Sequence, residues 1–286
     1  MTVLGVIGGS GLYQMHGLER GEWLSVDTPF GAPSDAYFIG DLEGVRVVFL
    51  PRHGRGHRLL PSELNFRANI YGMKKLGVEQ LIAVSAVGSL KKDIAPGHLV
   101  VPDQFIDRTR GRISTFFGRG IVAHVSFADP MCSELTRRLV AVGRERGATI
   151  HEGGTYICME GPQFSTRAES FLYRSWGADI IGMTNLQEAK LAREAEICFA
   201  TLALATDYDC WNTESSDVVI KDVLAILNKN VAMAQDIIHG VIKQLPDERA
   251  CPCAHALAQA IITDRAQIPA AIRQELGIIV GKYLGE

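Results

Sequence analysis

The chain lacks the features that mark membrane, secreted and nucleic-acid-binding proteins. Its longest apolar runs fall far short of the roughly 18 residues that a membrane-spanning helix needs. It has no block of basic residues, and a net charge of -3 with a pI near 6.3 argues against sequence-independent binding to a phosphate backbone. The first residues show no basic segment followed by a cleavage site, so we expect no signal peptide. We therefore expect a cytoplasmic protein that binds neither a membrane nor nucleic acid.

The chain does contain enough apolar sequence for one large core: of its 286 residues, 47% are hydrophobic and 21% are charged. Strand-like apolar runs alternate with segments of helical periodicity, without a repeat or a low-complexity linker. The expected strands are Val3–Ile7, Val45–Leu50, Leu81–Ser85, His98–Val101, Gly154–Met159, Asp179–Ile181 and Ile197–Thr206. This alternation predicts an α/β fold, a single domain with a central mixed, largely parallel sheet flanked by helices.

Helical periodicity and end signals predict where the helices lie. In chain order, the expected helices are one capped by Ser62 and ending before Gly77, one around Leu135–Val142 ending before Gly147, and a long amphipathic one over Val219–Leu245. The segment Pro246–Cys253 is the single break in this pattern. We expect residues 1–245 to form the main domain and residues 246–286 to add a loop and a helix that pack on it.

Two carboxylates follow the most apolar predicted strand. The run Ile197–Ala205 ends in Thr206-Asp207-Tyr208-Asp209, and the carboxyl end of a strand in an open α/β sheet faces the ligand crevice. Asp207 and Asp209 alternate, so both side chains could face one side of an extended backbone and read a ligand or supply a proton. A turn or a helix cap is an equally good interpretation of these two residues alone.

Three further strand ends carry residues suited to an anion: Gly8–Gly11, Pro51–His57 and Ser85–Leu90. The first matches neither a Walker loop nor a full dinucleotide fingerprint, and alone a tight turn explains it better. The second has two arginines and two histidines, which suit a phosphate but also a solvated basic loop, and its histidines lack a third metal ligand nearby. The third offers small residues with two hydroxyls. Together these ends predict a phosphate or a phosphate ester in the crevice.

These residues also carry a family resemblance. In matching order, the motifs are Gly8-Gly9-Ser10-Gly11, Arg52-His53-Gly54-Arg55-x-His57, Asn65-Phe66-Arg67-Ala68-Asn69-Ile70, Glu160-Gly161-Pro162-Gln163-Phe164-Ser165, Gly182-Met183-Thr184 and Thr206–Trp211. From about residue 3 to residue 245, the chain resembles the methylthioadenosine-cleaving branch of the trimeric purine nucleoside phosphorylase family. It departs from some relatives at Gly182, where they carry Asn.

The resemblance implies a role for each matching position. Family contacts to phosphate match Ser10, Arg52, His53, Ser85, Ala86 and Thr184. Contacts to the nucleoside match Met183 at the ribose, Phe164, Asp207 and Asp209 at the purine, His57 near the 5' side, His124 reaching from a neighbouring subunit, and Ile220, Val223 and Leu224 around the 5'-methylthio group. The resemblance further implies a homo-oligomer, a trimer or hexamer, that uses phosphate as a co-substrate and needs no cofactor and no metal.

The implied reaction is phosphorolysis of S-methyl-5'-thioadenosine to adenine and 5-methylthioribose 1-phosphate. We expect phosphate to attack an oxocarbenium-like sugar while Asp207, with a pKa raised by burial, protonates adenine at N7. Relatives that act on 6-oxopurines usually carry Asn at this position, so Asp207 predicts a 6-aminopurine. The alternatives are a phosphorylase of purine nucleosides or methylthioinosine, a hydrolase that uses water, and a nucleoside-binding module without turnover.

We expect the six cysteines to be reduced in the cytoplasm. Cys251-Pro252-Cys253-Ala254-His255 has no second ligand pair at zinc-finger spacing, so the sequence does not predict a metal site there, and a disulfide between the two cysteines is the remaining alternative. The apolar surroundings of Cys132, Cys158 and Cys198 predict small core residues. No base is placed by the sequence to activate Cys210, so we do not expect a nucleophile.

Overall fold

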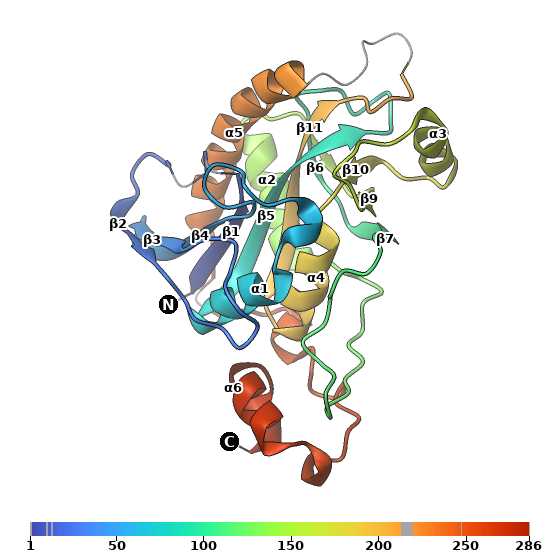
Figure 1. Cartoon of the computed structure of the whole chain (residues 1–286). Helices are drawn as coiled ribbons and strands as arrows, with labels where there is room; N and C mark the ends of the chain where they lie inside the picture. Colours follow the sequence, from blue (N-terminus) through green and yellow to red (C-terminus); the bar gives the residue numbers. More distant parts are fainter. Residues whose placement is uncertain (1, 10, 13, 213–219, 247, 286) are drawn as a thin grey trace.

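A computed structural model describes residues 2–9, 11–12, 14–212, 220–246 and 248–285, and the statements below concern these residues (Figure 1). They form one sheet of eleven strands and six α-helices. The strands are β1 (Val3–Gly8), β2 (Glu19–Leu24), β3 (Tyr37–Leu42), β4 (Val45–Pro51), β5 (Val78–Ser89), β6 (Leu99–Val101), β7 (Gln104–Arg108), β8 (Ile150–Glu152), β9 (Thr155–Met159), β10 (Ile180–Gly182) and β11 (Cys198–Asp207). The α-helices are α1 (Phe66–Lys75), α2 (Ser133–Glu145), α3 (Arg167–Ser175), α4 (Asn185–Glu194), α5 (Ile220–Ile242) and α6 (Ala270–Leu284), and the 3₁₀ turns are η1 (Pro61–Glu63), η2 (Pro252–His255) and η3 (Arg265–Gln267).

The sheet is mixed and largely parallel, which confirms the predicted fold class. Its main path runs β2-β3-β4-β1-β5-β10-β9-β7, and β11 pairs with β5 and leads on to β6 and β8. The pairs β1–β4, β1–β5, β5–β11, β9–β10, β7–β9 and β6–β8 are parallel. Antiparallel pairing occurs at β2–β3–β4, β5–β10 and β6–β11. Strand β5 therefore stands at the centre and contacts β1, β10 and β11.

Helices cover both faces of the sheet. Successive residues of a strand point to opposite faces, and in the central strands the residues on both faces are apolar. Phe49, Ile82 and Leu202 belong to the core beneath α2 and α5, whereas Leu50 and Leu81 belong to the core beneath α1, α4 and α6. Figure 1 shows α2 and α5 on the opposite side of the sheet from α1 and α4. This two-sided burial explains why the central strands are continuous apolar runs that the sequence makes easy to predict.

The predicted helix ends are confirmed at the glycines, but one predicted start is wrong. α1 ends at Lys75 and is followed by Gly77 with φ +81°, and α2 ends at Glu145 before Gly147 with φ +74°. Ser62 does not cap α1. It lies in η1 and donates a hydrogen bond to Glu160, while Asn65 caps α1 by accepting from Ala68 N at 3.2 Å.

Each predicted strand occurs, but several elements were not predicted from the sequence. β5 starts before Leu81 and runs through to Ser89, so Ser85 and Ala86 lie within a strand and not after one. The unpredicted elements are β2, β3, β7, β8, α3 and α4. β2 is exposed along its whole length and β8 has three residues, so neither shows the alternation by which strands are recognised.

The C-terminal segment packs on the rest of the chain. Leu257, Ile268, Leu276 and Val280 are buried in the same core cluster as α1 and α4. Residues 122–124 run beside residues 260–262, since His124 N donates to Ala260 O at 2.9 Å. In the described part of the chain, none of the helices is long and apolar enough to cross a membrane.

Candidate active site

A gap in strand pairing lies at the centre of the sheet. Along one edge, β5 pairs with β1 as far as Ala83 and with β10 from Gly88, so among the described residues no strand pairs with residues 84–87 on that edge. We call this stretch the β5 gap. Val84 O accepts a hydrogen bond there from Arg52, whereas Val87 O accepts one from the β11 side. Because successive residues of a strand direct their N–H and C=O groups to alternate edges, the N–H of Ala86 faces the gap.

Arg52 follows β4 and extends into the β5 gap. It is 3% exposed, and its Nε and Nη2 donate to the two carboxylate oxygens of Glu188 in α4 at 2.6 and 3.0 Å. Nη1 donates to Val84 O at 2.7 Å, and Nη2 also donates to Ile7 O at 3.3 Å. These four bonds leave one N–H on Nη1 without a partner in the described part of the chain. Arg52 thus joins β1, β5 and α4, and it can offer an anion one N–H group and part of its charge.

His53 is neutral and presents one ring nitrogen as an acceptor. Its Nδ1 lies 2.8 Å from Leu59 O, and because a carbonyl can only accept, Nδ1 carries the proton. Burial lowers the pKa of His53 to about 4, so Nε2 has a free lone pair at neutral pH. His57 is exposed and stacks on His53 with ring centroids 4.4 Å apart. Nε2 of His53 can therefore accept from a protonated phosphate oxygen or a sugar hydroxyl, but it cannot donate.

Two buried residues with hydroxyl groups belong to elements that Arg52 contacts, β5 and the start of α4. Ser85 is within the β5 gap, and its Oγ donates a long hydrogen bond of 3.3 Å to Ala86 O and lies near the Tyr156 hydroxyl. Thr184 is the N-cap of α4, the helix that carries Glu188 in its first turn, and its hydroxyl makes no capping bond. It is 3% exposed. Among the residues that the structure describes, no short hydrogen bond therefore holds the hydroxyls of Ser85 and Thr184.

The end of β11 is bulged, and this bulge directs Asp207. Ala205 pairs with Val87, but Asp207 pairs with the very next residue, Gly88, so two residues of β11 oppose one of β5. Asp207 Oδ2 accepts from the Thr206 hydroxyl at 2.7 Å, and Oδ1 accepts from Asp209 N at 2.8 Å. The chain turns at once, with φ +50° at Asp209. Asp207 thus ends the strand and Asp209 lies in the turn, so the two aspartates do not alternate along an extended backbone.

Burial raises the pKa of both aspartates. For Asp207, hydrogen bonds from Thr206 and Asp209 N partly oppose the effect of burial on its pKa. For Asp209, burial acts together with the nearby charge of Asp207, while the Ser170 hydroxyl lowers its pKa. Asp209 Oδ2 is buried without a hydrogen-bond partner among the described residues. Asp207 is consequently a carboxyl group that can hold a proton close to the β5 gap.

The loop before α3 is tied to the turn after β11. Cys210 Sγ donates to Ser165 O at 3.2 Å, and Arg167 Nε donates to Cys210 O at 3.1 Å. Phe164, which the resemblance assigns to the purine, belongs to this loop and is 52% exposed. The loop therefore brings an exposed aromatic ring to the same end of the sheet as Asp207.

Three residues that support this arrangement were not predicted from the sequence. Glu188 pairs with Arg52, and buried Arg112 donates from Nε to Glu160 at 3.1 Å and from Nη1 to Met183 O, which holds the segment before Thr184. Tyr156 is fully buried, and a Cβ at Gly182 would collide with its hydroxyl group. This collision explains the departure from relatives with Asn at that position. None of the three has a local sequence signal, because each acts on a partner far along the chain.

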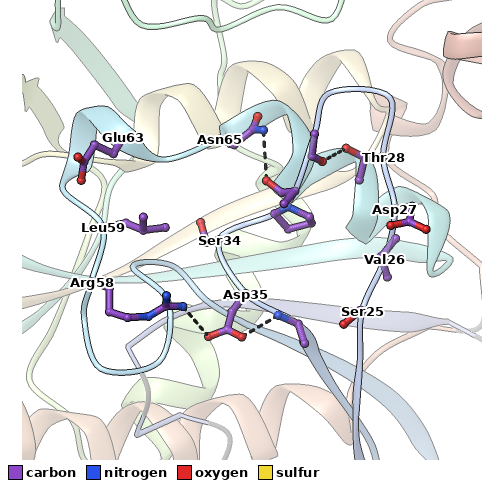
Figure 2. A pocket seen from close by; sticks show the side chains of 14 residues that line it. Ser25, Val26, Asp27, Thr28, Ser34, Asp35, Arg58, Leu59, Glu63 and Asn65 are labelled. Atoms are coloured by element: carbon purple, nitrogen blue, oxygen red, sulfur yellow. Dashed lines mark hydrogen bonds and ion pairs between the residues drawn. The ribbon is translucent and has the colours of Figure 1, made fainter.

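Some predicted site residues lie away from the β5 gap or outside the described residues. Ser10 and the side chains of Ile220, Val223 and Leu224 lie outside the described residues. His124 is exposed and lines a cavity of about 500 Å³ together with Phe117, Lys190 and Glu194. A second cavity of about 680 Å³ is bounded by Asp35, Arg58 and Leu59 and contains none of the predicted site residues (Figure 2).

Comparison with known proteins assigns the chain to a family. A family model described as the phosphorylase superfamily matches residues 3–243. The chain belongs to the phosphorylase superfamily. Among its phosphorylase relatives, a Geobacter sulfurreducens protein named S-methyl-5'-thioadenosine phosphorylase is 62% identical over 283 residues, which cover 99% of both chains. A Koribacter versatilis protein of the same name is 56% identical over 99% of this chain and 97% of its own.

Solved phosphorylase structures share the fold along the whole chain. The crystal structure of a methylthioadenosine phosphorylase from an antarctic soil metagenomic library is 48% identical and superposes with a TM-score of 0.93, over 97% of this chain and 98% of that one. Methylthioadenosine phosphorylase from Schistosoma mansoni in complex with adenine is 33% identical, with a TM-score of 0.80 over 98% of each chain.

Proposed function

We propose that this chain catalyses the phosphorolysis of S-methyl-5'-thioadenosine to adenine and 5-methylthioribose 1-phosphate. The full-length similarity to relatives of that name supports the proposal, as does the adenine bound by a structural neighbour. The observation that carries it is the juxtaposition of the β5 gap, which is suited to an anion, with a half-buried Asp207 whose pKa is raised. An anion and a proton donor at one crevice are what cleavage of a glycosidic bond by phosphate requires.

Phosphate would bind in the β5 gap. The N–H of Ala86, the free N–H of Arg52 and the hydroxyls of Ser85 and Thr184 can donate to its oxygens, and neutral His53 can accept from a protonated one. A phosphate oxygen then attacks C1' of the sugar as the C1'–N9 bond breaks. Holding the two reactants in place can contribute roughly 7 to 11 kcal/mol toward a bimolecular barrier.

Asp207 would protonate the departing base. The electron pair of the C1'–N9 bond passes to adenine, and a proton from the Asp207 carboxyl to N7 neutralises the developing charge. The Thr206 hydroxyl can donate to Val87 O, at 3.2 Å, in place of Asp207 Oδ2. The proton on the Asp207 carboxyl is then available for transfer to the base. Solvent restores the proton to Asp207 after adenine departs.

Asp207 would also select the base. A 6-aminopurine offers N–H donors to a carboxyl oxygen, whereas a 6-oxopurine would place a carbonyl against it and leave both acceptors unpaired. We therefore propose methylthioadenosine and not methylthioinosine as the substrate. Salvage of the purine and of the methylthio sugar follows from these products, and phosphate acts as a co-substrate without any cofactor.

The active form is proposed to be a homo-oligomer, a trimer or a hexamer. His124 lies beside the C-terminal segment, and Figure 1 shows this segment at the end of the molecule opposite to the carboxyl end of β11. For His124 to act on a nucleoside, it must therefore belong to another copy. A cytoplasmic location stays a prediction from the sequence.

The decisive experiment measures adenine release from methylthioadenosine with and without inorganic phosphate. We expect release only with phosphate, together with a sugar phosphate detectable by ³¹P NMR. Adenine release at equal rates in both conditions would indicate a hydrolase, and ligand binding without release would indicate a binding module. Either of these results would contradict the proposed function.

A further inference from the structure

Four cysteine side chains meet at one buried point. The Sγ atoms of Cys132, Cys198, Cys251 and Cys253 all lie within 4.8 Å of one another, and those of Cys198 and Cys251 are 3.1 Å apart. Their exposures are 2%, 1%, 8% and 6%. The sequence did not predict this cluster, because it combines a closely spaced pair with two cysteines 53 or more positions away.

Three separate parts of the fold hold the four side chains. Cys132 is the N-cap of α2 and its N–H donates to Phe199 O at 2.7 Å, which fixes it beside the start of β11. Cys198 is the first residue of β11, and Cys251 and Cys253 belong to the turn around η2. Because every member is anchored by regular structure or a turn, the cluster does not depend on flexible side chains.

The cluster is suited to thiolates. The Leu135 N–H, at the start of α2, makes a hydrogen bond to the Cys132 side chain. The guanidinium of Arg249 lies 3.9 Å from Cys198 Sγ and also donates to Glu196 O at 2.8 Å. A cation and amide N–H groups beside sulfur are the surroundings that stabilise a negatively charged thiolate site.

We propose that Cys132, Cys198, Cys251 and Cys253 bind one Zn²⁺ ion in a tetrahedral, four-thiolate site. Four sulfurs that each lie about 2.3 Å from a tetrahedral zinc are about 3.8 Å from each other. The four Sγ atoms lie within 4.8 Å of one another, so small shifts of the side chains would bring them to that separation. Binding releases four protons to solvent and changes no oxidation state, and the resulting site has a charge of about -2 that Arg249 partly balances. Four protein ligands leave no open position, so the zinc is structural.

The zinc would fasten the C-terminal segment to the sheet. Cys251 and Cys253 immediately precede the residues that carry Leu257, Ile272 and Leu276 into the core beneath α1 and α4. Cys198 and Asp207 stand at opposite ends of β11, about 30 Å apart at about 3.3 Å per residue. We therefore expect the metal to act on folding stability and not on the reaction, so this inference does not depend on the proposed function.

The test is the metal content of full-length protein purified under reducing conditions from zinc-containing medium. We expect about one zinc per chain in the parent, and we expect it to be lost in Cys132→Ser and Cys253→Ser. Cys158→Ala is the matched control, because Cys158 is also a fully buried thiol but lies outside the cluster. It should retain zinc whatever it does to stability.

Two further measurements keep the result clear if a variant folds poorly. Cobalt substituted into the parent should show the absorption of tetrahedral thiolate coordination, and a strong chelator should lower the melting temperature of the parent but not that of a zinc-free variant. Parent protein that contains no zinc would overturn the inference. This holds whether the four cysteines react as free thiols or give no thiol signal because they form disulfides. Iron in place of zinc would contradict the choice of metal.

Discussion

Replacement of Asp207 by Asn removes a proton while it preserves nearly every contact of the side chain. The Asn oxygen can still accept from Asp209 N, which lies 2.8 Å from Asp207 Oδ1. The Asn amide can donate to Thr206 Oγ1, whose own proton can go to Val87 O at 3.2 Å. Because no buried group loses its partner, we expect a stability change below about 1 kcal/mol, or a few degrees in melting temperature.

The catalytic loss should be far larger than the loss in stability. A positioned general acid contributes about 10²- to 10⁴-fold, so kcat on methylthioadenosine should fall by that factor, equivalent to about 3 to 5 kcal/mol. The Asn amide can instead donate to the 6-oxo group, so the preference for methylthioadenosine over methylthioinosine should fall at least about tenfold. Asp129→Asn, at an exposed aspartate with no side-chain partner described, is the matched control and should change neither value.

The pH profile supplies an independent readout. Burial raises the pKa of Asp207, and only the protonated form can act as an acid, so the parent's rate should fall as pH rises through that pKa. The Asn variant should lack this falling limb. A parent that prefers methylthioinosine, or a variant with unchanged preference and unchanged pH profile, would refute the role given to Asp207.

Other predictions concern the support of the site and its assembly. Glu188→Gln removes the carboxylate that faces Arg52 inside the protein, and the unpaired buried guanidinium should lower the free energy of unfolding by about 3 kcal/mol in urea titrations. Burial raises the pKa of Glu194 to about 7, so its contribution to stability is complete below pH about 4 and is lost as pH rises to 7. Glu194→Gln should remove this pH dependence, worth at most about 3 kcal/mol in unfolding measurements from pH 5 to 8. Coexpressed His124→Ala and Asp207→Asn chains, each nearly inactive alone, should form mixed trimers in which one site of three is intact and active, or about one quarter of all sites when the two chains combine at random.

Each of these predictions has a control or a contradicting result. Glu134→Gln, which removes a partly exposed ion pair with Arg137, should cost about 1 kcal/mol or less, and a similar loss for Glu188→Gln would mean that Arg52 does not need its partner. Parallel pH profiles for the parent and Glu194→Gln would show that another group governs stability there. Mixed chains with no activity above the two separate variants would place His124 outside a shared site.

The sequence by itself determined the class of the fold and predicted the strand ends at which its chemistry would lie. Buried parallel strands need continuous apolar runs, and helices end where a glycine can adopt positive φ, so both leave local signals such as Ile197–Ala205 and Gly77. Elements with weak local signals were missed. β2 is exposed along its whole length. Ser62 has a side chain that could cap a helix, but its hydroxyl donates a hydrogen bond to Glu160 instead.

Only the tertiary structure decided how those positions combine. The β5 gap exists because β1 and β10, which are far apart in the chain, pair with different halves of one strand. The pairing of Arg52 with Glu188 spans 136 positions, and Cys132 meets Cys253 across a comparable distance along the chain. Such contacts are set by strand register and packing, which depend on the whole core at once, so no local pattern could have predicted them.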